Sequence, residues 1–223
     1  MAHAVQPAAP AAPPAETGIG VYTQKLGMWV FLASEVMFFT ALIGTYIILR
    51  WGSAESWPVP QDILNIPLTA FNTFVLICSS VSMVKAYAAA THDDQKGLRF
   101  WLVLTVLAGA TFVGVQVLEY RHLIHEGLLP SGIREGSALA ARLVDSGKLT
   151  ATAAGLFGSA FFTMTGFHGF HVTCGVICMT FVTIKAFRGG YSGGRFHGVE
   201  VIGLYWHFVD LVWIILFTIV YLI

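Results

Sequence analysis

Long apolar stretches separated by short polar segments make up most of this 223-residue chain. In one of them, from Phe161 to Phe187, Lys185 is the single charged residue. At a rise of about 1.5 Å per residue, a helix of this length crosses a hydrocarbon core about 30 Å thick. Five such stretches predict an all-α integral membrane bundle of five transmembrane helices, at about 26–49, 66–89, 98–120, 154–187 and 199–222.

The segments outside the five spans differ in character. Residues 1–24 are rich in Ala and Pro and predict a flexible tail, because they cannot bury enough apolar surface to offset the entropy of ordering. This tail lacks the basic start and apolar core of a cleaved signal peptide. We expect one transmembrane domain over 25–223. Its longest loop, at about 122–153, contains one predicted short helix at Ser137–Val144.

Composition agrees with a membrane setting. Hydrophobic residues are 56% of the chain and charged residues 11%, whereas an average soluble domain has about 25% charged residues. Twelve basic and twelve acidic residues give no net charge, which argues against a nucleic-acid partner. The three cysteines, Cys78, Cys174 and Cys178, fall in apolar segments and are expected to be buried free thiols.

The distribution of Lys and Arg predicts the orientation, because cytoplasmic loops carry the excess. Seven basic residues flank the spans on the side of the N-terminus: Lys25, Lys85, Lys96, Arg99, Lys185, Arg188 and Arg195. Five lie on the other side: Arg50, Arg121, Arg134, Arg142 and Lys148. We therefore expect a cytoplasmic N-terminus and a periplasmic C-terminus.

Candidate chemistry lies in the polar residues of the spans. Seven acidic or histidine side chains lie within or near the membrane: Glu35, Glu119, His168, His171, Glu200, His207 and Asp210. Each costs a few kcal/mol in hydrocarbon unless it is paired. They predict a polar bundle interior or a buried interface with another protein.

Glu35 is the only charged residue of the first span. A carboxylate facing lipid is unfavourable, so Glu35 is expected to face other helices. Two roles remain open, a neutral hydrogen-bonded structural group and a group that takes part in proton movement.

His168 and His171 are three residues apart and therefore share one helix face. Glycines at 166, 169 and 175 remove side chains near that face and let another helix approach closely. This helix is expected to lie inside the bundle, where other helices supply polar partners for the two imidazoles.

Two further groups lie near other spans. His207 and Asp210 also have a spacing of three, so Asp210 is expected to satisfy an imidazole on its own helix. Glu119 with Arg121 and His122 predicts a polar cluster at the membrane surface, with a conducting site as the alternative.

Metal sites and hydrolase chemistry are less well supported. His171, Cys174 and Cys178 fall at i, i+3 and i+7, but a dinuclear copper site on this pattern would lie in mid-membrane without a following ligand loop. Haem ligation by His168, His171 or His207 would need histidines facing one another across a slot. A Ser-His-Asp hydrolase is also poorly supported, because no serine lies in a glycine-flanked turn next to these histidines in the sequence. We interpret the histidines as structural and expect no metal in this chain.

Four sequence segments together resemble subunit III of the haem-copper oxidases, and they occur in the same order as in that family. They are GMWVFLASEVMFF at 27–39, QVLEY at 116–120, TGFHGFHV at 165–172 and YWHFVDLVW at 205–213. The resemblance covers about residues 25–223 and is closest to the short five-helix bacterial form of cytochrome c oxidase subunit III.

The resemblance implies a subunit without redox centres, in a respiratory complex of the bacterial plasma membrane. Haem and copper are expected in its partner subunit I. Subunit II is a second expected partner and a candidate for binding further copper. Additional subunits of a respiratory supercomplex are also candidate partners. The family is thought to stabilise the oxidase during turnover, to support cytoplasmic proton uptake and to bind phospholipid.

Individual residues match the family's pattern. Glu35 corresponds to its buried carboxylate, and His168 and His171 correspond to its histidine pair. We hypothesise that Glu35 hydrogen-bonds to one of them. Lys185 or Arg188 is the candidate for binding a lipid headgroup, and the simpler alternative is that both flank a span.

Other functions remain open. Within the family, a quinol oxidase or a nitric oxide reductase is an alternative to cytochrome c oxidase. Outside it, a proton-coupled transporter could also place Glu and His in a bundle, but internal repeats or broken helices would be expected. The chain shows neither.

Overall fold

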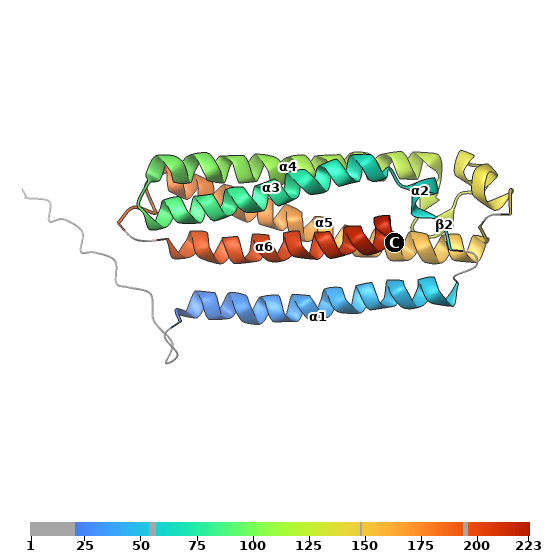
Figure 1. Ribbon diagram of the computed structural model, residues 1–223, viewed down its shortest axis with the longest axis horizontal. Helices are drawn as coiled ribbons and strands as arrows, with labels where there is room; N and C mark the ends of the chain where they lie inside the picture. Colours follow the sequence, from blue (N-terminus) through green and yellow to red (C-terminus); the bar gives the residue numbers. More distant parts are fainter. Residues whose placement is uncertain (1–20, 54–56, 148, 194–195) are drawn as a thin grey trace, which may run out of the picture.

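The computed structural model describes residues 21–53, 57–147, 149–193 and 196–223, and its long helices lie side by side (Figure 1). Five are long and apolar enough to cross a membrane. In chain order, the helices are α1 (Thr23–Gly52), α2 (Pro60–Ile63), α3 (Ile66–Thr91), α4 (Gln95–Glu126), η2 (Ala140–Val144), α5 (Ala151–Phe187), α6 (His197–Phe217) and η3 (Thr218–Leu222). Two strands, β1 (Leu128–Leu129) and β2 (Gly132–Ile133), form an antiparallel hairpin.

The predicted all-α membrane bundle is confirmed, and each of the five predicted spans lies within a helix or a helix with its π-helical extension. The helices run beyond the apolar stretches, most clearly in α4, which continues to Glu126. Most of the expected N-terminal tail lies outside the described residues, and α1 already begins at Thr23. Lys148 and Arg195 of the charge count also lie outside them.

Local sequence signals set the helix ends. The side chains of Asn65, Asp94 and Thr150 accept hydrogen bonds from backbone N–H groups in the first turns of α3, α4 and α5, respectively. Such bonds satisfy donors that the helix itself leaves unpaired. At the other end of α4, Gly127 takes a left-handed conformation with φ of 109° and ends the helix.

α6 is the most buried of the five long helices and packs against α1, α3 and α5. Its Trp206 ring is fully buried against Gly109 of α4 and Gly175 of α5, where a methyl group would lie within 3.0 Å of the ring. The Trp206 Nε1–H donates a 2.9 Å hydrogen bond to Ser79 Oγ of α3. Glycine at these two positions therefore makes room for the central tryptophan.

α1 lies at the edge of the bundle, beside α6 (Figure 1), and contacts α5 and α6. It is the least buried of the five long helices. Exposed apolar side chains include Val30, Val36 and Met37. In a membrane such a surface faces lipid at little cost, so polar contacts carry more weight in fixing this helix.

The loop between α4 and α5 is more ordered than its composition indicates. The β1–β2 hairpin follows α4 and packs on α5, where the absent side chain of Gly158 leaves room for the Leu129 carbonyl oxygen. The π-helical turn η2 lies where the sequence predicts a short helix.

Candidate functional site

A carboxyl–imidazole pair joins α1 to α5 near the middle of α1. The Oε2 atom of Glu35 lies 3.2 Å from Nε2 of His171. The two side chains are largely buried, with 17% of Glu35 and 12% of His171 exposed. His171, and not His168, is therefore the histidine that lies beside Glu35, and the hypothesised hydrogen bond between them stays a prediction.

The bonds of His171 restrict where its protons lie. Its Nδ1 is 2.7 Å from the carbonyl oxygen of Phe167, which only accepts hydrogen bonds, so Nδ1 carries a hydrogen. The other ring nitrogen, Nε2, is the atom that faces the Glu35 carboxyl.

Aromatic rings surround this pair. The ring of Phe39 lies 5.3 Å from that of His171, and Phe170 lies 5.7 Å from it. Phe38 contacts Phe167 at 5.0 Å between centroids. These rings offer no strong hydrogen-bonding groups, so His171 is the polar neighbour that the described residues provide for the Glu35 carboxyl.

His168 faces a different part of the bundle. Its ring is fully buried and stacks on Trp213 at 4.8 Å between centroids, with Phe112 edge-on at 5.9 Å. Among the described residues, neither ring nitrogen has a hydrogen-bond partner. Positions three apart are rotated by about 60° at 3.6 residues per turn. This rotation lets His171 meet α1 while His168 points to the core.

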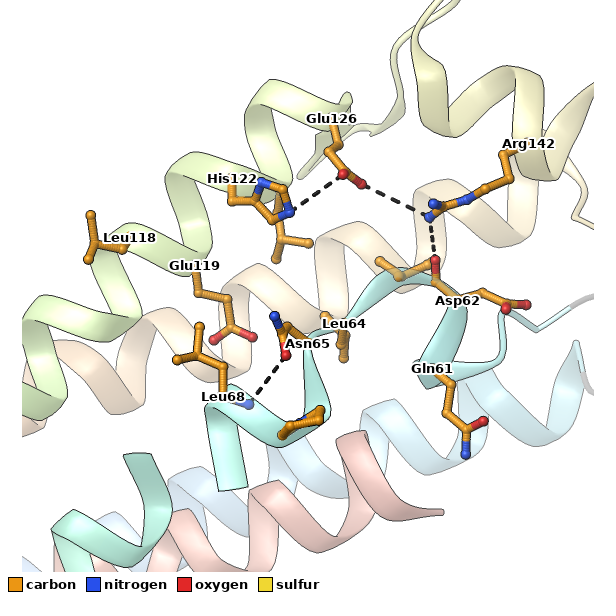
Figure 2. Close-up of a pocket in the computed structure, with 13 residues that line it drawn as sticks. Gln61, Asp62, Leu64, Asn65, Leu68, Leu118, Glu119, His122, Glu126 and Arg142 are labelled. Atoms are coloured by element: carbon orange, nitrogen blue, oxygen red, sulfur yellow. Dashed lines mark hydrogen bonds and ion pairs between the residues drawn. The ribbon is translucent and has the colours of Figure 1, made fainter. Parts of the chain in front are cut away.

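Glu119 is bonded inside the bundle. It is 7% exposed, accepts a 2.9 Å hydrogen bond from the Thr69 hydroxyl and lies 3.3 Å from the Tyr221 hydroxyl. His122 instead contacts Glu126, at 3.4 Å (Figure 2). Glu119 and His122 line one pocket, but the bonds of Glu119 are to neutral hydroxyls of α3 and η3.

His207 and Asp210 do not form the expected direct hydrogen bond. The Nδ1 atom of His207 lies 3.2 Å from the Ser80 hydroxyl of α3. The Oδ1 atom of Asp210 is buried and has no hydrogen-bond partner in the described part of the chain. The physical reason is again the rotation of about 60° between positions three apart, which leaves the hydroxyl of a neighbouring helix closer.

Glu200 ties the start of α6 to the start of α1. Lys25 Nζ lies 2.5 Å from its Oε1 atom, and the Tyr22 hydroxyl donates a 2.8 Å hydrogen bond to Oε2. Burial and the neighbouring Glu200 carboxylate raise the pKa of Tyr22, which keeps this hydroxyl a donor. The His197 ring lies against that of Tyr22, at 4.4 Å between centroids and tilted by 54°.

Lys185 and Arg188 are exposed at the end of α5. The Lys185 ammonium lies 5.0 Å from the centroid of the Tyr191 ring, a cation–π contact. Both side chains therefore lie where they could meet a headgroup.

The described residues contain no group of three or more His, Cys, Asp and Glu side chains that could hold a metal ion. Of the expected buried thiols, Cys78 and Cys178 are exposed on the surface of the chain, and Cys174 is half-buried. They lie on the outer faces of α3 and α5, which a membrane or a partner would cover.

The sequence did not predict which neutral hydroxyl groups would contact Glu119 and His207. Thr69, Thr73 and Ser80 recur at helical intervals in α3 and face the interior, with Asn72 and Ser79 beside them. This spacing was visible as a polar stripe in an apolar segment. The contribution of Tyr221 was not visible, because its distance from Glu119 in the sequence gives no local signal.

The chain matches the family described as "Cytochrome c oxidase subunit III" over residues 16–125 and 146–223. It is 35% identical over 197 residues to a probable cytochrome c oxidase subunit 3 of Nocardia farcinica, covering 88% of this chain and 86% of the relative.

Two relatives from Bacillus differ in the donor that their names imply. A cytochrome c oxidase subunit 3 of Bacillus sp. (strain PS3) is 32% identical over 216 residues, covering 96% of this chain and 92% of the relative. A quinol oxidase subunit 3 of Bacillus subtilis is 32% identical over 197 residues, covering 88% of this chain and 85% of the relative.

Proposed function

Because this chain belongs to the cytochrome c oxidase subunit III family, we propose that it stabilises the catalytic subunit of a terminal oxidase and supports its proton uptake. The accessory role in a haem-copper oxidase follows from the family and its relatives. Subunit I is the proposed carrier of haem and copper, with subunit II as a second partner. Cytochrome c is the proposed electron donor.

The observation that carries the proposal is the Glu35–His171 pair. It joins the edge helix α1 to the longest helix, α5, near the middle of α1. We propose that the two side chains share one exchangeable proton. A single polar tie of this kind contributes about 0.5–2 kcal/mol between membrane helices. We propose that it keeps α1 in place, and its proton is the feature that connects it to proton uptake.

Two substitutions at Glu35 separate these roles in the assembled oxidase. Glu35→Gln retains a hydrogen-bond donor toward His171 Nε2 but cannot release a proton, whereas Glu35→Ala removes both properties. A structural tie predicts that Ala shortens the lifetime of the oxidase during turnover and that Gln preserves it. A role in proton movement predicts that Gln also lowers the rate of proton uptake.

Ser34→Ala is the matched control, because Ser34 neighbours Glu35 on α1 and, among the described residues, its hydroxyl bonds only to the Phe31 carbonyl of the same helix. The measurements are turnover-dependent inactivation and proton uptake in reconstituted vesicles. Wild-type stability and uptake in both Glu35 variants would exclude a working role for the pair.

We also propose phospholipid binding at the end of α5, through Lys185 or Arg188. The supporting features are exposed cations at the end of a membrane-spanning helix. Replacing both with Ala is expected to reduce the anionic lipid that co-purifies with the oxidase, and an unchanged lipid content would contradict this proposal.

The proposed location is a bacterial plasma membrane, with the N-terminus in the cytoplasm. The excess of Lys and Arg on that side supports this orientation. Labelling of a cysteine introduced beside Lys25 by an impermeant reagent added to intact cells would contradict it.

A further inference from the structure

A pocket of about 520 Å³ lies at the end of the bundle opposite Lys185 and Arg188 (Figure 2). Its walls come from α2, the start of α3, the end of α4 and η2. It therefore forms where the chain between α4 and α5 folds back over the helix ends, and it is separate from the Glu35–His171 pair.

The depth of this pocket follows from the length of α4. This helix has 32 residues and is about 48 Å long at 1.5 Å per residue, which exceeds a hydrocarbon core of about 30 Å by about 9 Å at each end. Glu119 lies about 10 Å before the final residue of α4, Glu126. The pocket thus extends from the edge of the hydrocarbon into the headgroup layer.

The pocket is apolar on one side and charged on the other. Leu68 and Leu118 lie at one side of Figure 2, and Arg142 lies at the opposite side, with Glu119 and His122 between them. The two leucines are exposed on the surface of the chain. A ligand that fills this pocket would need an apolar part beside the two leucines and a polar part beside the charged residues on the side of Arg142.

The carboxylates of the pocket differ in their partners. Glu126 already has basic side chains beside it, with Arg142 at 4.0 Å and His122 at 3.4 Å. Glu119 is buried, and its hydrogen bonds come from the neutral hydroxyls of Thr69 and Tyr221. Among the described residues it forms no ion pair with Lys, Arg or His. A buried carboxylate is stabilised when a ligand brings it a cation with N–H donors.

We propose that this pocket binds a zwitterionic phospholipid with a primary ammonium headgroup, such as phosphatidylethanolamine. The ammonium donates hydrogen bonds to Glu119, the phosphate lies toward Arg142, and the acyl chains leave over Leu68 and Leu118. The inference goes beyond the accessory role in the oxidase and concerns a different end of the bundle from Lys185 and Arg188.

The charges of the pocket distinguish this lipid from the other common classes. Asp62, Glu119 and Glu126 share the lining with one Arg and one His, so a purely anionic headgroup would add a negative charge to a wall that already has three acidic side chains. A choline headgroup has no N–H to donate and places methyl groups against the Glu119 carboxylate. Selectivity for the primary ammonium is therefore the property to measure.

The test uses the purified oxidase complex that contains this chain. The complex is depleted of lipid and incubated with vesicles of phosphatidylethanolamine, phosphatidylcholine and phosphatidylglycerol in equal amounts, and native mass spectrometry counts the lipids that remain bound. Glu119→Gln keeps an acceptor for the two hydroxyls but removes the negative charge. It is expected to weaken retention of phosphatidylethanolamine about tenfold and leave phosphatidylcholine unchanged.

Two further variants complete the test. Arg142→Gln is expected to weaken retention of all three phospholipids by a similar factor, because it removes a contact to the shared phosphate. Glu135→Gln is the matched control, since Glu135 is exposed in the same loop and lies outside the pocket lining. It is expected to change nothing.

The proposal would be overturned if the wild-type complex retained phosphatidylcholine or phosphatidylglycerol to the same extent as phosphatidylethanolamine. The same conclusion would follow if intact Glu119→Gln complex kept wild-type selectivity. If the complex with Glu119→Gln fails to assemble, the test rests on the lipid selectivity of the wild-type complex and on Arg142→Gln. Equal retention of phosphatidylethanolamine by Arg142→Gln and wild type would overturn the proposal.

Discussion

At the scale of single residues, the two histidines of α5 have different environments although they are only three positions apart. His171 lies beside Glu35 and bonds to the Phe167 carbonyl, whereas His168 stacks on Trp213 without a hydrogen-bond partner in the described part of the chain. The difference predicts that their polar groups contribute unequally to stability.

We therefore expect His168→Phe to be tolerated, because phenylalanine keeps the stacking on Trp213 and adds no unpaired nitrogen to the core. His171→Phe should lower the stability of the subunit by about 1–3 kcal/mol, since it leaves the Glu35 carboxyl buried without its partner. Thermal unfolding of the detergent-solubilised complex measures both. Equal loss in the two variants would show that His168 has a polar role that its contacts do not reveal.

At the scale of helices, a glycine of α4 makes room for a tryptophan side chain that reaches it from α6. Gly109 faces the buried ring of Trp206, where an added methyl group would lie 2.6 Å from a ring carbon. Gly114, on the same helix, has no atom within 4 Å of the position of such a methyl group. We therefore expect replacement by alanine to change the stability of the bundle differently at these two positions.

Gly109→Ala is expected to destabilise the bundle by about 1–3 kcal/mol, because the buried indole has no free space into which to move. Gly114→Ala should be neutral or stabilising by up to about 1 kcal/mol, since alanine favours the helix. Unfolding of both variants in the same detergent provides the comparison. A smaller loss for Gly109→Ala than for Gly114→Ala would contradict the packing of Trp206.

Sequence reasoning predicted the elements better than their ends or their contacts. Hydropathy located all five membrane helices, because an apolar stretch long enough to span lipid has few alternatives. It ended the third span near Tyr120, whereas α4 continues through polar residues to Glu126, since a helix does not stop where the hydrocarbon stops. The bond between His207 and Ser80 joins two helices, and no local pattern specifies such a contact.

At the scale of the whole molecule, α1 is joined to the other helices by polar contacts at three heights. Lys25 pairs with Glu200 at one end, Glu35 with His171 near the middle, and Arg50 donates to main-chain oxygens of Ile219 and Ile223 at the other end. Because lipid solvates the apolar surface of α1, these contacts hold the edge helix in the arrangement that a partner subunit would meet.

The central claim is that this chain is an accessory subunit and that the redox centres belong to its partners. The most direct measurement is purification through a tag on this chain from its native membrane in mild detergent, followed by a reduced-minus-oxidised optical spectrum and metal analysis. Haem a and copper are predicted to co-purify with subunits I and II and to remain with them when this chain is dissociated. A chain that purifies alone, or that keeps haem or copper after dissociation, would contradict the claim.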